Sequence, residues 1–475
     1  MTRFNQKSTG TKTVNLAGGE AYMQNPKLEL LSILLTSFAN DQFYRSGDDT
    51  FDRLRQLLNQ NNAMFAAKAA VFARTKFGMR SISHVLASEL AKYLSGEKWA
   101  KDFYNAIIYR PDDMMEIISY HKQHGKISNA MKKGFAKAFD KFDEYALAKY
   151  KGESRDFKLI DLVNLIHPIP VERNAEALAS LVKGELKSFD TWETELSNAG
   201  QIANSEEEKE ELKKGVWIKL IREKKIGYFA LLRNLRNIIE QAPEIINEAI
   251  ELLLNESLIK KSLVLPFRFT TAFEEIQKLN NGKIIREVMI ALNKAVDISV
   301  NNVPKFDGDT LVVLDTSGSM VGKPAQIGSL FAAVLVKSNN ADLMTFSDRA
   351  YYQNVNYLDS TITISQSIRF AMGGTNFHDI FRVTNKKYDR IIILSDMQGW
   401  IGYDTPTKDF NLYKQITGAN PFIYSFDLNS YGSMQFPENN VYCIAGFSEK
   451  IFDIMKLLEQ DRNAFINEIE KISFS

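Results

Sequence analysis

The chain has 475 residues, a length at which a single hydrophobic core normally gives way to two or more domains. Its 45% hydrophobic and 25% charged residues are typical of a globular protein, and they exclude a disordered chain. The net charge of +1 conceals an asymmetry, because residues 1–300 carry an excess of about five basic residues and residues 301–475 an excess of about four acidic ones. We therefore expect a polyanion to bind the N-terminal part.

The N-terminal residues and the cysteine content help to predict the cellular compartment of the protein. Residues 1–10 lack the apolar core and the small-residue cleavage site of a secretory signal, and no apolar run in the chain has membrane-spanning length. Cys443 is the single cysteine of the sequence, so a disulfide within the chain is impossible. These features predict a cytoplasmic protein, in which Cys443 is a buried strand residue rather than a reactive thiol.

Residues 25–300 are predicted to form one amphipathic helix after another, with apolar residues at helical spacing. Representative helices are expected at 28–38, 50–58, 63–77, 83–94, 127–149 and 158–166. Antiparallel helix pairs in such numbers indicate a HEAT-like helical-repeat array, although the sequence shows no repeat of fixed period. The acidic run at 205–211 predicts a solvated loop or the start of a helix.

Basic and aromatic residues alternate between positions 127 and 158. Lys133, Lys137 and Lys141 recur at intervals of one helical turn, a spacing that could follow the phosphates of an RNA backbone. The neighbouring aromatic residues have the spacing of a buried stripe: Phe135, Phe139 and Phe142. From the residues alone, a solvated helix face above a buried stripe is the favoured interpretation.

The pattern changes near residue 300. Short apolar runs alternate with helical segments, which is the rhythm of a doubly wound parallel sheet. Strands are predicted at 311–314, 342–346, 390–394, 422–426 and 441–444, and helices at 325–337, 377–386 and 448–458. We place the junction within 298–304, which gives a helical domain over 1–304 and an α/β domain over 305–475.

The loop after the first predicted strand combines one carboxylate with two hydroxyls, on Asp315, Ser317 and Ser319. Oxygen ligands of this kind suit a divalent cation such as Mg²⁺, with Mn²⁺ or Ca²⁺ as alternatives. A capped turn would also use these residue types. The pattern resembles the metal-ion-dependent adhesion site of von Willebrand factor A domains. That resemblance implies that Thr375 and Asp396 complete the site, each in a loop at the expected place.

Several stretches of the N-terminal part resemble the TROVE module of the Ro ribonucleoprotein family: 15–22, 149–168, 217–223, 229–235 and 263–269. A TROVE module followed by a von Willebrand factor A domain is the Ro architecture. The resemblance implies a monomeric ring of helices whose ends are clasped by the A domain. It also implies small non-coding RNA of the Y type on the outer surface, and single-stranded RNA ends in the central hole. The short N-terminal arm is more similar to bacterial or phage members than to animal ones.

The resemblance further assigns RNA contacts to Lys149, Lys151, Arg155 and His167, with the three lysines 133, 137 and 141 as weaker candidates. His167 precedes Pro168, so we expect it to be extended at the end of a helix. A histidine at such an edge can stack on a nucleotide or bond to it. The alternative is a half-buried histidine that caps the helix.

Three classes of function follow. The first is a ribonucleoprotein component that binds RNA in quality control or stress response, with an exoribonuclease or another protein as a possible partner. The second is a protein-adhesion module that binds an acidic partner group through its cation. An enzyme is disfavoured, because phosphatases of the haloacid-dehalogenase type need a carboxylate two residues after the first, where this chain has Ser317. No phosphate-binding glycine motif is present, and the histidines lack the spacing of a zinc site.

Overall fold

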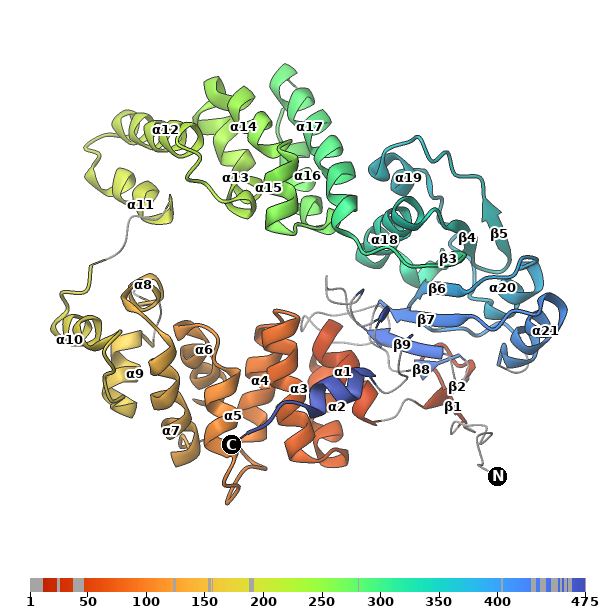
Figure 1. The fold of residues 1–475 in the computed structure, drawn as a ribbon, viewed down its shortest axis with the longest axis horizontal. Coiled ribbons are helices and arrows are strands. Elements are labelled where there is room, and N and C mark those ends of the chain that lie inside the picture. Colours follow the sequence, from red (N-terminus) through yellow and green to blue (C-terminus); the bar gives the residue numbers. More distant parts are fainter. Residues whose placement is uncertain are drawn as a thin grey trace.

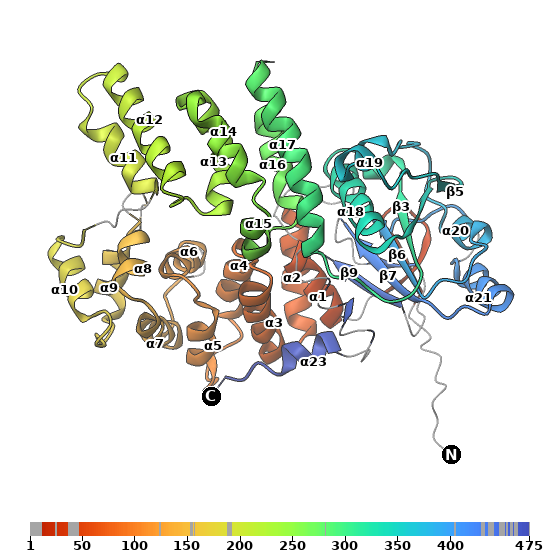
Figure 2. The same cartoon turned by 45° about the horizontal axis from the view of Figure 1, so that its top comes forward.

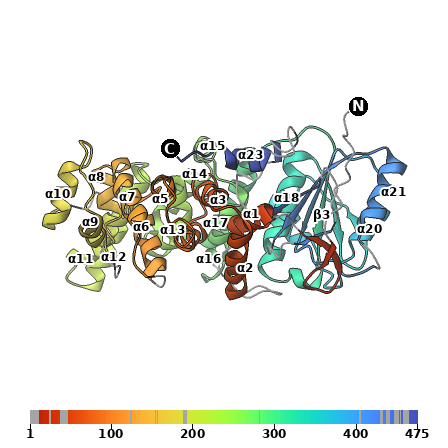
Figure 3. The ribbon, with the colours of Figure 1, turned by 90° about the horizontal axis from the view of Figure 1, so that it is seen from below.

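The computed structural model describes residues 12–23, 26–36, 47–122, 125–152, 155, 157–187, 192–280, 282–402, 405–428, 433–435, 441–445, 452, 455–456, 459 and 464–474. Two rows of helices and one α/β part are arranged in a ring, with the α/β part joining the two rows (Figure 1). Seen from below, the two rows overlap and the sheet stands at one end (Figure 3). The expected combination of a helical ring and a doubly wound sheet is confirmed.

The first row consists of helices α1 to α10 and one 3-10 turn. Their bounds are α1 (Pro26–Thr36), α2 (Gly47–Gln60), α3 (Ala63–Lys76), α4 (Ser81–Leu90), α5 (Ala100–Ile107), α6 (Pro111–His121), α7 (Asn129–Ala138), η2 (Phe139–Lys141), α8 (Glu144–Lys149), α9 (Leu159–Ile166) and α10 (Ala175–Lys183). The apolar faces of these helices form one continuous core, which also includes one face of the sheet.

One predicted helix of this row, at 127–149, is wrong. The helix α7 ends at Ala138, Phe142 is extended, and α8 begins after Asp143, whose side chain accepts a hydrogen bond from the backbone N–H of Ala146. The cap explains the break, because an aspartate before a helix satisfies one of the N–H groups that have no partner within the helix.

The second row packs around a core of its own. Its elements are α11 (Trp192–Ile202), α12 (Glu206–Arg222), α13 (Tyr228–Gln241), η3 (Pro243–Ile245), α14 (Ile246–Leu253), α15 (Glu256–Ser262), η4 (Pro266–Phe269), α16 (Thr270–Gln277), α17 (Lys283–Ser299) and η5 (Val300–Asn302). The acidic run is a helix start, as expected, with Ser205 as the cap of α12.

The sheet of the α/β part has the strand order β5-β4-β3-β6-β7-β9, in which β5 is antiparallel and the other strands are parallel. The strands are β3 (Thr310–Asp315), β4 (Asp342–Phe346), β5 (Ala350–Gln353), β6 (Arg390–Ser395), β7 (Phe422–Asp427) and β9 (Val441–Ala445). The helical elements are η6 (Gly318–Met320), α18 (Lys323–Asn339), α19 (Thr361–Ser367), α20 (Phe377–Val383) and α21 (Thr407–Thr417). Cys443 lies in β9, but its side chain and most of the helix predicted at 448–458 are outside the described residues.

Alternate residues of β3, β4, β6 and β7 enter the two cores that flank the sheet. Leu311 and Val313 of β3 pack with α20 and α21, whereas Val312 and Leu314 share a core with α18. This alternation follows from the two-residue period of a strand, and burial on both faces explains the continuous apolar runs of the sequence.

The two terminal segments cross between the two parts of the molecule. The strands β1 (Lys12–Val14) and β2 (Glu20–Met23) form a hairpin that pairs with β8 (Ser433–Met434). In the opposite direction, α23 (Ala464–Glu470) packs against α3 (Figure 2). The domain boundary at residue 304 stays a prediction. The β1–β2 hairpin and α23 each pack on the part that lies beyond this boundary.

The α/β part contacts the ends of both rows. The strand β9 lies beside α1. At the other end, Phe267 of η4 meets Phe331 of α18 edge to face, with 5.6 Å between ring centroids. Asp297 of α17 accepts hydrogen bonds from the N–H and the hydroxyl of Thr361, at 2.8 and 2.6 Å, and so caps α19. Among the described residues, no helix combines the length and the hydropathy that crossing a bilayer would require.

Candidate cation and RNA sites

Two aspartates lie side by side at one edge of the sheet. Asp315 is the last residue of β3, and Asp396 directly follows the neighbouring strand β6. Parallel neighbours end at the same edge, so the topology brings the two carboxylates together, and both are fully buried.

The three predicted hydroxyl ligands come from the loops next to these carboxylates. The side-chain oxygens of Ser317 and Ser319 are 3.3 Å apart, and Thr375 is buried in the loop before α20. Two backbone bonds join the loops: the N–H of Gly318 donates to the carbonyl of Gly373 at 3.0 Å, and Met372 donates to Thr316 at 2.9 Å. All five predicted ligands therefore line one edge of the sheet.

Hydrogen bonds and burial set the charge of this site. Ser395 donates its hydroxyl to one oxygen of Asp315 at 2.5 Å, and the N–H of Ser317 donates to the other at 2.8 Å. Burial and the charge of Asp396 raise the pKa of Asp315 to about 7. Burial also raises the pKa of Asp396.

The donor set fits a hard divalent cation. The Oδ2 atom of Asp396 is buried without a hydrogen-bond partner, and in the described part of the chain no basic side chain pairs with Asp396 or Asp315. A cation between the carboxylates would satisfy both observations. Within the described ranges no group of three His, Cys, Asp or Glu side chains gathers as a metal site, so the hydroxyls would have to act as ligands.

Sequence reasoning missed Asp348, which supports the glycine loop of the site. Its carboxylate accepts the N–H of Gly374 at 3.0 Å, and its carbonyl accepts from the Asn376 amide at 2.9 Å. A β-carbon on Gly373 would lie 2.1 Å from the same carboxylate, so any larger residue there would displace the Asp348 side chain. Asp348 follows the end of β4, and its place at the same sheet edge was the signal that could have identified it.

Three large apolar side chains are exposed on the loops that carry the predicted ligands. Val321, Met372 and Trp400 are 53%, 57% and 52% exposed, and each comes from a different loop that carries a ligand. Trp400 lies over Gly374, whose β-carbon would be 2.6 Å from the indole ring. Met372 holds a positive φ of 60°, a conformation that costs energy for a residue with a side chain.

The candidate RNA segment, residues 149–158, has described residues near both ends of α6. At its start, the guanidinium of Arg110 sits 4.3 Å from the ring centroid of Tyr150. At its end, the ammonium of Lys122 lies 5.5 Å from the ring centroid of Phe157. These contacts hold Tyr150 and Phe157 against the first row.

The four residues of the main RNA prediction differ in their surroundings. Lys149 is exposed and lies over the ring of Tyr145, whereas Lys151 donates to the carbonyl of Leu186 at 2.8 Å. Arg155 is about one third exposed and contacts Glu116 at 3.3 Å. Arg155 therefore has a structural partner as well as a surface position.

His167 is exposed at the C-terminal end of α9. The expected extended conformation is wrong, because its φ of 48° and ψ of 64° are left-handed. Its N–H donates to the carbonyl of Val163 at 2.9 Å, so the residue ends the helix by satisfying one of the last carbonyls.

The weaker candidates do not form one stripe. Lys133 and Lys137 lie on α7 and are exposed, and Lys137 pairs with Asp140 at 2.6 Å. Lys141 lies in the 3-10 turn that follows, and its ammonium donates to the carbonyls of Asn105 and Ile108 at the end of α5. The interrupted helix thus takes Lys141 out of the row. The predicted buried stripe is confirmed for Phe135, Phe139 and Phe142.

A buried charge network beneath the RNA segment was not predicted. Its centre is Asp113, which accepts from Arg74 at 2.9 Å and lies 3.1 Å from the Nε2 atom of His84. The Nδ1 atom of His84 lies 2.8 Å from Glu116. Burial opposes ionisation of Asp113, but His84 and Arg74 outweigh it and lower the pKa of Asp113. Because these side chains come from α3, α4 and α6, the network fixes three helices relative to one another.

Comparison with known proteins adds to this geometry. Residues 21–195 and 182–289 match the TROVE domain. Telomerase protein component 1 of Mus musculus is 22% identical over 376 residues, which covers 57% of this chain and 14% of that protein. The Rattus norvegicus protein of the same name is 20% identical over 383 residues, covering 59% and 14%. The chain thus matches only a small part of the length of these relatives.

A crystal structure of the Deinococcus radiodurans RO (RSR) protein is similar over 94% of this chain and 99% of that chain, with a TM-score of 0.61 and 16% identity. That similarity shows the same fold. Because the TROVE matches together cover more than half of the sequence, this chain belongs to the TROVE domain family.

Proposed function

We propose that this protein binds small structured, Y-like RNA on the outer surface of its first helical row. The observation that carries the proposal is a set of exposed basic side chains around the ends of α6 and the residues that follow α10. Lys122, Lys149 and Lys158 are exposed on this surface. Lys183 and Lys187 are exposed next to Leu186, whose carbonyl binds Lys151. Such a surface suits the phosphates and the shape of folded RNA.

Lys149 and His167 are the sharpest probes of this surface. Lys151 and Arg155 also bind a carbonyl and a carboxylate of the protein, so their removal could loosen the fold. We expect the double variant Lys149→Ala, His167→Ala to bind a Y-like hairpin RNA about tenfold more weakly at physiological salt, on the order of 1.4 kcal/mol. Its salt dependence should also be shallower than that of the wild type.

The matched control is the double variant Lys260→Ala, Lys261→Ala, which removes two exposed lysines from α15 in the other row. Filter binding and circular dichroism of both variants separate lost contacts from lost structure. If the control weakens RNA binding as much as the Lys149 and His167 variant does, only total charge matters and the assigned surface is wrong.

The finer part of the proposal concerns RNA ends and quality control. Single-stranded ends of misfolded RNA would enter the hole of the ring, while the structured part of the RNA stays outside. The protein would act without catalysis, and an exoribonuclease would be a suitable partner. An RNA with a single-stranded 3′ tail should then compete better than its blunt form, and incubation with RNA, nucleotides and phosphoesters should yield no turnover.

A second candidate function is adhesion of a protein through the cation site. The specific observation is the exposure of Val321, Met372 and Trp400 on the loops that carry the predicted ligands, together with the unpartnered oxygen of Asp396. Asp315, Ser317 and Ser319 would hold Mg²⁺, with Mn²⁺ or Ca²⁺ as alternatives, and Thr375 and Asp396 would complete the site. The bound cation would supply an electrophilic position for a partner carboxylate. Release of a co-purified protein by chelator, and its retention in Mg²⁺, would test this function.

A further inference from the structure

The first loop of the described chain, between β1 and β2, packs on the loop that carries Asp396. The side-chain amide of Asn15 donates to the carbonyl of Gly399 at 2.5 Å. The backbone N–H of Leu16 donates to the Oε1 atom of Gln398 at 2.8 Å. These bonds join positions more than 380 residues apart in the sequence.

The shape of this first loop is set by its own residues. The Oδ1 atom of Asn15 accepts from the N–H groups of Ala17 and Gly19, at 3.0 and 2.9 Å. Gly18 has a φ of 85°, which favours glycine. A β-carbon on Gly19 would lie 2.0 Å from the carbonyl oxygen of Gly399, so the two backbones approach too closely for any other residue. The family-like stretch at 15–22 therefore has a physical explanation as a docking surface.

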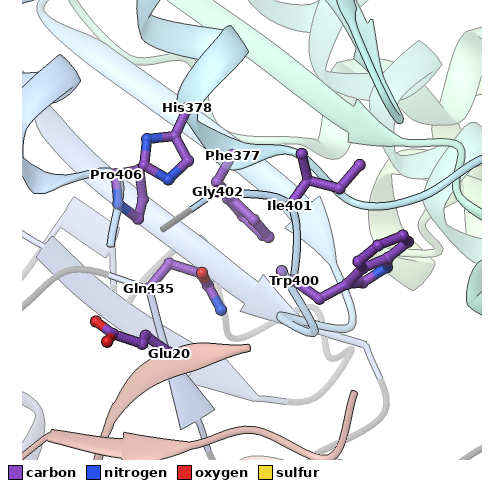
Figure 4. Close-up of a pocket in the computed structure, with 9 residues that line it drawn as sticks. Glu20, Phe377, His378, Trp400, Ile401, Gly402, Pro406 and Gln435 are labelled. Carbon is purple, nitrogen blue, oxygen red and sulfur yellow. The ribbon is translucent and has the colours of Figure 1, made fainter. Parts of the chain in front are cut away.

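The contact continues to the proposed cation ligand through Gln398. The N–H of Gln398 donates to the Oδ1 atom of Asp396 at 3.2 Å, and its side-chain amide donates to the Asp396 carbonyl at 3.1 Å. The side-chain amide of Gln435 also donates to the carbonyl of Met397 in this loop, at 2.8 Å. In Figure 4 the Gln435 side chain lies between the N-terminal strand that carries Glu20 and the loop of Trp400 and Gly402. The Asp396 loop is thus held by Gln398 within it and by the N-terminal loop against it.

The same hairpin also joins the α/β part to the first helix of the ring. Tyr22 of β2 pairs with Met434, and its hydroxyl lies 3.0 Å from that of Thr405. The helix α1, the first of the ring, begins at Pro26, three residues after β2 ends. Docking of the hairpin therefore places the start of the helical row on the α/β part.

We propose that docking of the N-terminal hairpin, residues 12–23, and cation binding between Asp315 and Asp396 are thermodynamically linked. Asn15 and Gln398 are positioning residues, which act on the cation through Asp396. The inference rests on the proposed cation site and adds its regulation. Linkage is reciprocal, so the docked hairpin raises cation affinity and the bound cation tightens the hairpin by the same factor.

The test uses the full chain and Mg²⁺ alone as the probe. Calorimetry gives the Mg²⁺ affinity, and amide hydrogen exchange of residues 12–23 with and without Mg²⁺ reports docking. We expect Asn15→Ala and Gln398→Ala to weaken Mg²⁺ binding about tenfold, within the usual range of coupling between sites. In the wild type, Mg²⁺ should slow exchange of the hairpin. Lys12→Ala is the matched control, because Lys12 lies on the same hairpin in an exposed ion pair with Glu20.

Gly19→Ala is a second variant, since its β-carbon prevents the close approach to Gly399 and forces undocking. Unchanged Mg²⁺ affinity in Gly19→Ala, together with faster exchange of the hairpin, would overturn the linkage and leave the cation site intact. A wild-type chain that binds no Mg²⁺ at millimolar concentration would overturn the cation site itself and the linkage with it.

Discussion

Replacing Asp396 with asparagine should stabilise the cation-free protein while removing cation binding. Asp315 and Asp396 are buried together, and the described residues provide them with no basic partner. Without a cation, their mutual repulsion and their burial both disfavour the charged forms. The variant Asp396→Asn keeps the size of the side chain and removes one of the two charges.

The magnitude follows from the pKa of Asp315. Its folded value of about 7 lies above the reference value of 3.8, so the folded state holds its proton longer than the unfolded state. Stability is then lost as pH rises from about 4 to about 7, by roughly 4 kcal/mol in total at most. Burial is the larger cause and persists in the variant, so we expect removal of the Asp396 charge to restore roughly 1–2 kcal/mol at pH 8.

Amide hydrogen exchange of β3 and β6 in chelator at pH 8 measures this effect within the α/β part. A gain of 1–2 kcal/mol in the free energy of opening corresponds to roughly 5- to 30-fold slower amide exchange of these strands. At pH 5 the difference between the variant and the wild type should shrink, because Asp315 is then protonated in both. Saturating Mg²⁺ should reverse the order, because a ligand stabilises only the form that binds it.

The control is Asp307→Asn, which removes an exposed carboxylate from the same part of the chain and should leave exchange of both strands unchanged. If Asp396→Asn opens faster than the wild type in chelator at pH 8, the two carboxylates do not repel each other in the folded protein. The electrostatic account of the cation site would then be refuted.

Three further outcomes are expected. Asp315→Ala should abolish Mg²⁺ binding in calorimetry while the helical circular dichroism signal stays unchanged. Asp113→Ala should destabilise the first row by roughly 3–5 kcal/mol in urea unfolding, because it leaves Arg74 buried without its carboxylate. Lys137→Ala removes one partner of an exposed ion pair and should cost under about 1 kcal/mol. Similar losses of stability in both variants would contradict this prediction. Phe474→Ala should expose the segment around α23 to protease, because its ring stacks on Trp99 with centroids 5.5 Å apart, and unchanged cleavage would show that the stack does not hold the segment.

Much of the α/β part could be predicted because β3, β4, β6 and β7 are buried on both faces. Such strands read as continuous apolar runs, and these four lie where the runs predicted them, within one residue at each end, as does β9. The edge strand β5 and the hairpin β1–β2 were missed. Their residues are half exposed, and the partner of β2 is more than 400 residues away, so no local pattern reports the pairing.

The candidate sites show the same difference between local sequence patterns, which could be predicted, and long-range contacts, which could not. Asp315, Ser317 and Ser319 form a short local pattern at a strand end, and the topology of the sheet brings Thr375 and Asp396 beside them. The prediction that Lys133, Lys137 and Lys141 share one helix face was wrong, because it assumed an uninterrupted helix. The residue pattern of that stretch favours a helix, whereas the break at Phe142 depends on a cap at Asp143 and on the burial of aromatic side chains.

The exchange of terminal segments has a consequence for biosynthesis. Asn15 is made well before its partner Gly399, which follows 384 residues later. At roughly 5–20 residues per second, the N-terminal hairpin would wait about 20–80 seconds without its docking surface. During that time its strand edges remain open to pairing with other chains, a known route to aggregation. The ring of this protein is therefore closed only after the Gly399 loop has been made, and the helices made before it must stay folded, or be protected by chaperones, until then.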